Sequence, residues 1–83
     1  MDQKEIFNSL VKLITPYARN KEALANVTEN TKILADLDVN SARLVDVVMA
    51  MEDEFDIEIS DEEVDQVSTI GAAVKMIGEK LKG

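Results

Sequence analysis

Residues 36–55 read DLDVNSARLVDVVMAMEDEF, and this stretch predicts the central helix of the fold. A polar turn leads to Ser41, after which an apolar run without glycine or proline ends in the acids Glu52-Asp53-Glu54. Serine is a favoured N-cap because its side-chain oxygen accepts a hydrogen bond from a backbone N–H that the first helical turn leaves unpaired. The stretch therefore predicts a helix that Ser41 caps and that ends near Phe55.

The apolar residues of this helix form two neighbouring stripes. One has the spacing i, i+4, i+7, i+11 of a buried face and consists of Leu44, Val48, Met51 and Phe55. The other consists of Ala42, Val45 and Met49. Because the combined apolar arc is wider than one core contact requires, we expect part of it to face a partner.

A first helix is predicted at the N-terminus. Asp2 and Glu5 have the spacing of a capping box, and apolar side chains follow at helical intervals, namely Ile6, Leu10, Leu13, Ile14 and Tyr17. Pro16 either ends this helix near Ile14 or opens a short second turn after Thr15. Residues 20–40 are predicted to be a long ordered connection, although residues 21–25 could extend a helix. Its apolar side chains should hold it to the core: Val27, Ile33, Leu34 and Leu37.

Two further helices are predicted after an extended connector at residues 56–59. Ser60 and Glu63 form a capping box for a short helix that ends near Asp65. Ser68 or Thr69 should cap the last helix, whose core stripe is Ile70, Ala73, Val74, Ile77 and Leu81. The predicted fold class is all-α. It is a small four-helix bundle of three longer helices and one short helix, with a long loop between helices one and two, in one domain of residues 1–83.

The composition excludes several kinds of chemistry. The chain has no cysteine and no histidine, which removes disulfides, thiolate nucleophiles, the usual zinc ligands and the commonest general base. Its N-terminus has neither a basic segment nor a long apolar run, so we expect no signal peptide, no membrane span and a cytoplasmic location.

The net charge of −8 is unevenly distributed along the chain. Residues 33–65 contain twelve acids and one base, Arg43, whereas the remaining residues carry a net charge of +3. The electrostatic field of this acidic region attracts basic protein surfaces and repels nucleic acid. We therefore expect protein partners and no nucleic acid partner; a solvated acidic surface that serves only solubility is the alternative.

Two rival functions can be weighed from the sequence. Asp36, Asp38 and Asn40 copy the first ligand positions of an EF-hand calcium loop, but Ser41 stands where glycine is needed and Val47 where a bidentate glutamate is needed. An enzyme is also disfavoured, because the dense carboxylates lie in helix starts and connectors and Ser41 has no histidine to activate it. We predict no metal site, no catalytic residue and no autonomous catalysis.

The chain resembles the acyl carrier proteins over almost its whole length. The resemblance rests on Val27-Thr28-x-x-Thr31-x-Ile33-x-x-Asp36-Leu37-x-x-Asn40-Ser41, on residues 44–55, on Ile59-Ser60-Asp61-Glu62-Glu63 and on Thr69-Ile70. In that family the serine of an Asp-Ser-Leu motif carries 4′-phosphopantetheine, and here that serine is Ser41. The resemblance implies a carrier of acyl thioesters for fatty acid or specialised lipid biosynthesis, and a helix start suits a phosphate group.

The resemblance also implies two sets of contact residues and a set of partners. A partner-binding surface would comprise Ala42, Val45, Asp46, Met49, Glu52 and Asp53. An acyl pocket between helices would draw on Leu44, Val47, Met51, Phe55, Ile59, Val64 and Val67, each of which could equally be plain core. The implied partners are a phosphopantetheinyl transferase and acyl-transferring and chain-elongating enzymes with basic patches, and we expect a monomer.

Four positions depart from the family pattern. Asn40 stands where the family has aspartate, Ala42 where it has leucine and Asp38 where glycine is usual, while Arg43 is positive where many members are neutral or acidic. The loss of an acid and an apolar contact beside the serine predicts weaker docking to general-purpose partners and a dedicated partner set. An aminoacyl, peptidyl or D-alanyl carrier, or an unmodified interaction module of the same fold, stays open as an alternative.

Overall fold

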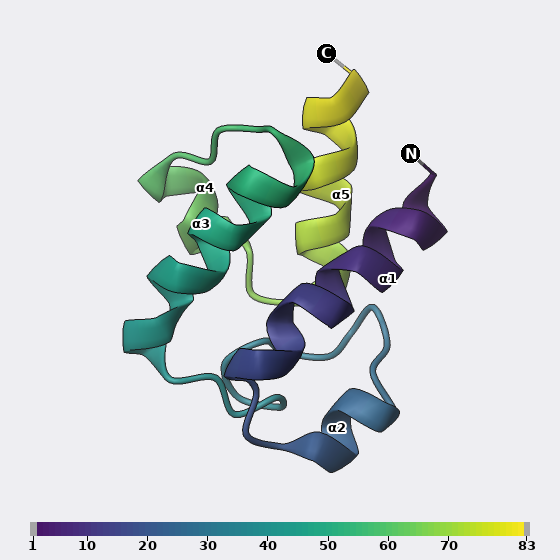
Figure 1. Ribbon diagram of the computed structural model, residues 1–83, viewed down its shortest axis with the longest axis vertical. Helices are drawn as coiled ribbons and strands as arrows, with labels where there is room; N and C mark the ends of the chain where they lie inside the picture. Colours follow the sequence, from purple (N-terminus) through teal and green to yellow (C-terminus); the bar gives the residue numbers. More distant parts are fainter. Residues whose placement is uncertain (1, 83) are drawn as a thin grey trace.

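The computed structural model describes residues 2–82, which fold into helices joined by loops and contain no strand (Figure 1). The elements in order are α1 (Gln3–Ile14), η1 (Thr15–Tyr17), α2 (Lys21–Ala25), η2 (Ser41–Arg43), α3 (Leu44–Phe55), α4 (Asp61–Gln66) and α5 (Ile70–Lys82), where η denotes a 3-10 turn. The all-α prediction is confirmed, with α1, α3 and α5 as the three long helices. The long connection additionally contains α2, which Asn20 caps by accepting a hydrogen bond from the Ala23 N–H at 3.1 Å.

The start and the end of α1 follow the sequence. Asp2 caps the helix by accepting the Glu5 N–H at 2.8 Å. Both alternatives for Pro16 occur together: α1 ends at Ile14, and Pro16 lies in η1 as an early residue of that turn. Proline suits this position because the first N–H groups of a helical turn have no partner within the turn.

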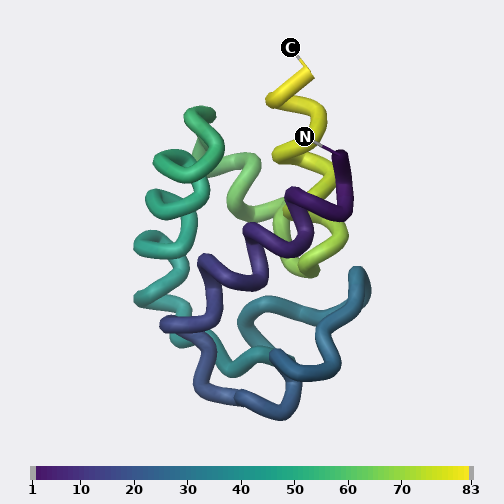
Figure 2. Tube along the Cα trace, turned by 45° about the vertical axis from the view of Figure 1, so that its right-hand side comes forward, coloured from purple at the N-terminus to yellow at the C-terminus, as the bar shows by residue number. Residues whose placement is uncertain are grey.

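The connection between α2 and η2 is tied to the start of α5. The Ile70 N–H donates to the Thr31 carbonyl at 2.9 Å, and the Ile33 N–H donates to the Ser68 carbonyl at 3.1 Å. Figure 2 shows this connection, in blue, folded across one end of the bundle. Ile33 and Leu37 are buried as predicted and Val27 is half-buried, but Leu34 is 40% exposed. The prediction for Leu34 is wrong because the chain turns immediately after Ile33, and only one of the two neighbours can face the core.

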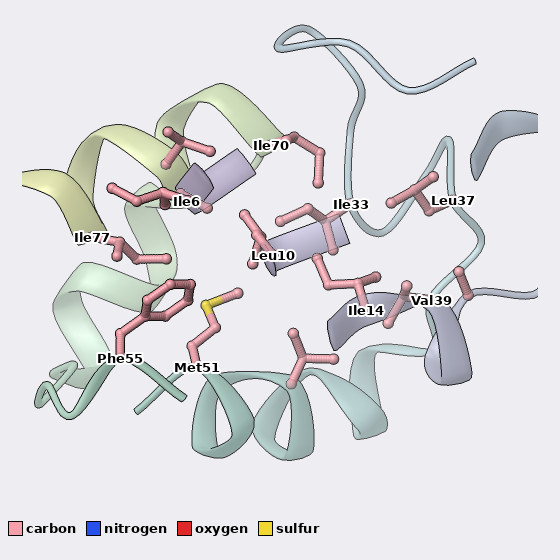
Figure 3. Close-up of a cluster of buried hydrophobic side chains, with 14 residues drawn as sticks. Ile6, Leu10, Ile14, Ile33, Leu37, Val39, Met51, Phe55, Ile70 and Ile77 are labelled. Carbon is pink, nitrogen blue, oxygen red and sulfur yellow. The ribbon is translucent and has the colours of Figure 1, made fainter. Parts of the chain in front are cut away.

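The core lies between the three long helices, where α1 packs chiefly against α5 and also against α3. Figure 3 shows Met51 and Phe55 of α3 pointing into this apolar cluster, together with side chains of α1, α5 and the connection. Its members are Ile6, Leu10, Ile14, Ala18, Ile33, Leu37, Val39, Val47, Met51, Phe55, Ile70, Ala73, Val74 and Ile77. Such burial is the main source of stability in so small a domain.

Two predicted core positions need correction. In α3 the fully buried line is Val47, Met51 and Phe55, whereas Leu44 and Val48 are only half-buried. The apolar stripe is therefore rotated toward Val47, because α3 packs against α1, whereas Leu44 and Val48 lie on the side of α4, which packs less closely against α3. Leu81 is 38% exposed, since it lies one turn beyond Gly78, which faces Ile6, the first buried residue of α1.

The short helix α4 begins as predicted. Ser60 Oγ accepts the Glu63 N–H at 3.2 Å, and Glu63 Oε1 accepts the Ser60 N–H at 3.0 Å, so both halves of the capping box form. Of the two candidate caps for α5, Thr69 is the one used, because its Oγ1 accepts the Ala72 N–H at 3.1 Å. Within residues 2–82, no helix is both long enough and apolar enough to span a membrane.

Candidate functional site

The start of the central helix differs from the prediction, because the 3-10 turn η2 occupies Ser41–Arg43 and α3 itself begins at Leu44. Asn40 is the cap: its backbone is extended, and its Oδ1 accepts the Ala42 N–H at 2.9 Å. Ser41 is the first residue of η2, and its carbonyl accepts the Leu44 N–H. The prediction that Ser41 caps the helix is therefore wrong. Asparagine caps as well as serine does, so Asn40 caps the 3-10 turn that begins at Ser41, and Arg43, which precedes α3, makes no side-chain cap within the described range.

The Ser41 side chain is consequently available to solvent. Ser41 is exposed, and its hydroxyl makes no hydrogen bond to any residue in the described range. It lies at the N-terminal end of η2 and α3, a run of 15 residues from Ser41 to Phe55 in which the helical N–H groups point toward it. The unpaired donors and the dipole of a helix start favour a negatively charged group.

The first turns of α3 present an apolar patch beside Ser41. Val45 and Met49 are 63% and 57% exposed, and Ala42 is exposed as well. Large apolar side chains this open on adjacent turns are typical of a contact surface rather than of a core. The structure thus brings the three apolar residues of the predicted partner surface onto the face of the helix that the bundle leaves uncovered.

The acidic residues of that predicted surface are not equivalent. Asp46 is paired with Arg43, whose Nη1 lies 3.1 Å from Asp46 Oδ2. Glu52 Oε2 accepts the Ile59 N–H at 2.9 Å and so fastens the connector before α4. Asp53 is exposed, and no hydrogen bond or ion pair of its carboxylate occurs among residues 2–82. Intramolecular contacts therefore engage two of the three carboxylates.

A small apolar cavity lies between α3, α4 and α5. It is lined by Leu44, Val48, Met51, Ile59, Val64, Val67 and Met76. Its volume is about 10 Å³, close to the least that holds one water molecule. Five of the seven residues that the sequence suggested for an acyl pocket meet here, while Val47 and Phe55 lie in the central core. Val48 and Met76 were missed, although the spacing of Met76 three residues after Ala73 puts it at the edge of the α5 stripe.

An ion pair links α4 to α5 beside this cavity. Lys80 Nζ lies 2.8 Å from Glu63 Oε2 and donates a hydrogen bond to Glu63 Oε1 at 3.0 Å. The Lys80 hydrogen bond, assisted by the bond from the Ser60 N–H, holds the pKa of Glu63 below its ordinary value. Glu63 thus joins the capping box of α4 to the C-terminal half of α5. Within residues 2–82, no cluster of acidic side chains has the arrangement of a metal site.

Comparison with known proteins assigns this geometry to a family. The family model for phosphopantetheine attachment sites matches residues 20–77. An acyl carrier protein of Lactobacillus acidophilus is 40% identical over 78 residues, which cover 93% of this chain and 94% of that protein. This chain belongs to the acyl carrier protein family.

Further relatives agree in sequence and in fold. The acyl carrier protein of Caulobacter vibrioides is 48% identical over 54 residues, which cover 65% of this chain and 69% of the relative. The solved structure of the acyl carrier protein from Enterococcus faecalis superposes with a TM-score of 0.79 at 32% identity, covering 96% of this chain and 99% of that one. The predicted family, cofactor and function are confirmed: the chain is an acyl carrier whose covalent cofactor is 4′-phosphopantetheine.

Proposed function

We propose that Ser41 is the residue that carries 4′-phosphopantetheine and that the chain presents acyl intermediates, bound as thioesters, to enzymes of fatty acid or specialised lipid biosynthesis. The observation that carries the proposal is the exposed hydroxyl of Ser41, free of hydrogen bonds within residues 2–82, at the start of the central helix. The two other serines inside the matched range are Ser60, whose hydroxyl is engaged in a cap, and Ser68.

The residues around Ser41 suit the phosphate end of the group. Asn40 leaves Ser41 free because it caps the turn itself, and the helix start supplies a favourable field for a phosphodiester. The bound group supplies a terminal thiol, the nucleophile that a chain without cysteine lacks. The chain's own part is to hold, shield and deliver the thioester, while the chemistry belongs to partner enzymes.

The cavity between α3, α4 and α5 is our candidate for shielding an acyl chain. Leu44, Met51 and Val64 are among its lining residues, and its walls are almost wholly apolar. At about 10 Å³ it has room for one water-sized group, so an acyl chain requires the lining to separate. The helix best placed to move is α4, because it has only six residues and none of them is buried.

The partner surface follows α3 from Ser41 toward its acidic end. Ala42, Val45 and Met49 would provide apolar contacts, and Asp46, Glu52 and Asp53 would face basic side chains. The proposed partners are a phosphopantetheinyl transferase and acyl-transferring and chain-elongating enzymes. Asn40 and Ala42 replace the acid and the large apolar residue expected beside the serine, so we propose a dedicated partner set.

Modification of the purified apo protein tests the site. Incubated with coenzyme A and a phosphopantetheinyl transferase, the protein should gain the mass of one phosphopantetheine group. Ser41→Ala should gain none, whereas Ser68→Ala, the matched control at another exposed serine, should be modified like the parent. Modification of Ser41→Ala would show that the site is elsewhere, and loss in Ser68→Ala alone would place it at Ser68.

A comparison of two transferases tests the dedicated partner set. We expect a transferase from the same cell to modify the protein more efficiently than a broad-specificity transferase. Asn40→Asp combined with Ala42→Leu should reduce that difference, because it restores the acid and the apolar contact. Efficient modification by both enzymes, together with efficient support of bulk chain elongation, would contradict a specialised role.

A further inference from the structure

An open cleft of about 260 Å³ lies beside the start of the central helix. It is lined by Pro16 and Tyr17 of η1, by Arg19, and by Asn40 and Arg43 at the two ends of η2. In the sequence, Ser41 lies between Asn40 and Arg43. The fold holds the two walls together through backbone hydrogen bonds of the Arg19 N–H to the carbonyls of Leu37 and Asp38, at 3.1 and 3.2 Å.

The charge of this cleft is opposite to that of the molecule. The chain has only two arginines, 24 positions apart in sequence, and both line the cleft. None of the five lining residues carries a carboxylate. Lys21 adds a third positive charge nearby, since its Nζ donates to the carbonyl of Thr15 at 3.2 Å. In a protein with a net charge of −8, this local concentration of cations beside Ser41 is unexpected for a surface kept only for solubility.

The donors in the cleft have the chemistry of a phosphate site. Guanidinium groups bind phosphate oxygens through paired N–H donors, and arginine is favoured wherever such planar recognition occurs. Asn40 contributes an amide group whose oxygen is used by the Ala42 N–H, which leaves its NH₂ donors for a ligand. Tyr17 contributes a phenolic hydroxyl. Every polar side chain of the lining can therefore donate to an anion.

One acidic side chain competes with a ligand for Arg43, and the backbone of Asp38 helps to fix the position of Arg19. Asp46 already accepts a hydrogen bond from Arg43 Nη1 at 3.1 Å, so part of the Arg43 guanidinium is engaged. Asp38 approaches through its backbone carbonyl, which accepts the Arg19 N–H. Arg19 has no side-chain hydrogen bond or ion pair within the described part of the chain and is exposed. The guanidinium of Arg19 is therefore available to an anion, whereas that of Arg43 is shared between the cleft and Asp46.

We propose that the cleft formed by Tyr17, Arg19, Asn40 and Arg43 is a phosphate-binding subsite that holds the phosphate of the phosphopantetheine group. The identity of the ligand rests on the proposed attachment at Ser41, because the phosphate would then be joined to the residue between two members of the lining. The same chemistry could instead take a free phosphate of the donor before transfer. The anion site itself does not depend on Ser41.

A titration of the apo protein tests the subsite without any modification. Inorganic phosphate, and separately free 4′-phosphopantetheine, is added to ¹⁵N-labelled protein at constant ionic strength, with chloride as the reference anion. We expect saturable shifts of the arginine Nε–Hε signals of Arg19 and Arg43 and of the backbone amides of Tyr17 and Asn40. Absence of saturable shifts at these residues with both phosphates overturns the proposal.

Variants separate a defined site from general charge. Arg19→Gln should weaken phosphate binding by roughly threefold to tenfold, as expected for one charge-assisted contact at an exposed position. Arg19→Lys keeps the charge but loses the paired donors, so it should fall between the parent and Arg19→Gln. Lys12→Gln is the matched control, because it removes the same charge from an exposed position on α1. An equal loss in Lys12→Gln would contradict the site.

The modified protein distinguishes the two sources of phosphate. If the attached group occupies the cleft, the Arg19 Nε–Hε signal of the modified protein should already lie at the position of the phosphate-bound apo protein, and added phosphate should no longer move it. If added phosphate still binds as it does to the apo protein, the attached phosphate does not occupy the cleft, and the proposal for the attached group is overturned. Failure of modification at Ser41 would refute the proposed attachment site but would leave the apo titration fully informative.

Discussion

Asn40 and Ser41 divide between them two tasks that one residue could not perform together. A capping hydroxyl is occupied by the backbone N–H that it satisfies, whereas a modification site needs a free hydroxyl. Asn40 Oδ1 takes the cap at 2.9 Å from the Ala42 nitrogen, and the hydroxyl of Ser41 stays exposed. At a position where the family pattern has aspartate, the asparagine thus supplies a capping oxygen without a charge.

This division predicts different costs for two adjacent alanine substitutions. Asn40→Ala removes the cap and should lower the free energy of unfolding by about 1 kcal/mol. Ser41→Ala removes no hydrogen bond and should change it by less than about 0.5 kcal/mol. Urea unfolding of the apo proteins measures both, and Asn40→Asp, which keeps the capping oxygen, is the control. A larger loss in Ser41→Ala than in Asn40→Ala would contradict the assignment of the cap.

Two glycines of α5 give a second matched pair. A Cβ at Gly71 would lie 2.9 Å from the carbonyl oxygen of Glu29, which accepts the Gly71 N–H at 2.8 Å, so backbone must move. We expect Gly71→Ala to destabilise by about 1–3 kcal/mol. Among residues 2–82, a Cβ at Gly78 would meet only Ile6 Cδ1, at 3.7 Å, which is an ordinary contact. Gly78→Ala should therefore stabilise by about 0.5–1 kcal/mol in thermal unfolding, because alanine is the better helix former. Equal effects of Gly71→Ala and Gly78→Ala on stability would show that the backbone of Glu29 does not pack closely against α5.

Asp38 departs from the family pattern in its side chain, but its backbone adopts a conformation that is typical of glycine. Its φ is 55°, in the left-handed region that glycine adopts without strain, and glycine is the residue that the family pattern suggests there. Aspartate is among the few other residues that tolerate this conformation. The departure therefore preserves the turn before η2, at the cost of some strain.

The short helix α4 depends on a single ion pair more than the long helices do. None of its six residues is buried, and Glu63 supplies both its capping box and its link to Lys80. The pair thus restrains the helix that lines the proposed acyl cavity. Stability and cavity opening should respond to the protonation of one carboxylate.

The pH dependence of that pair has a definite sign. Because the pKa of Glu63 is lowered below its ordinary value of 4.5 by the hydrogen bond from Lys80, the folded state favours the ionised form. The stabilisation is present above the unfolded-state pKa and is lost as the pH falls through the lower folded-state pKa. The stability difference between the parent and Glu63→Gln should be largest near neutral pH and should vanish in acid. Lys80→Met should reduce this pH dependence to the part that the Ser60 hydrogen bonds supply, and an undiminished pH dependence in Lys80→Met would contradict the role of the pair.

The helix pattern of the sequence predicted most elements and failed where tertiary contacts decide. The capping box of Ser60 and Glu63 is local, so it could be predicted in full. The buried face of α3 could not be predicted in the same way. Whether Val47 or Val48 is buried depends on how α1 and α4 lie beside the helix. The position of Ser41 within its turn depended on competition between two neighbouring cap residues, which the sequence cannot rank.

For the whole molecule, the distribution of charge has a measurable consequence. Residues 33–65 carry twelve acids and one base, and Arg43 is already paired with Asp46. Salt shortens the range of the repulsion among these exposed acids, to about 10 Å at 0.1 M. We expect the Tm to rise by several degrees as monovalent salt is added, since about 1 kcal/mol shifts the Tm of a domain of this size by roughly 4–8 °C.

A neutralised variant provides the control for this salt effect. Asp53→Asn combined with Glu54→Gln and Glu58→Gln removes three exposed acids of that region. Its Tm should be higher than that of the parent at low salt and should rise less as salt is added. A parent Tm that is unchanged or lower in salt would show that repulsion among these acids does not destabilise the fold significantly.

The candidate site was predictable only in part, for a reason that also belongs to the whole molecule. Ser41 and the apolar residues Val45 and Met49 follow from local sequence and from the resemblance. The cleft of Arg19 and Arg43 joins residues 24 positions apart, and only the folding of the connection under α1 brings them together. No spacing rule on one chain could have revealed it.

Attachment of the group to Ser41 is tested by the intact mass of the protein purified from its native cell, followed by identification of the modified peptide. We expect the mass to exceed that of the sequence by one 4′-phosphopantetheine group, with or without an acyl chain on its thiol, and the group to lie on Ser41. A protein that has only the mass of its sequence, or one whose added group lies on any other residue, would contradict this expectation.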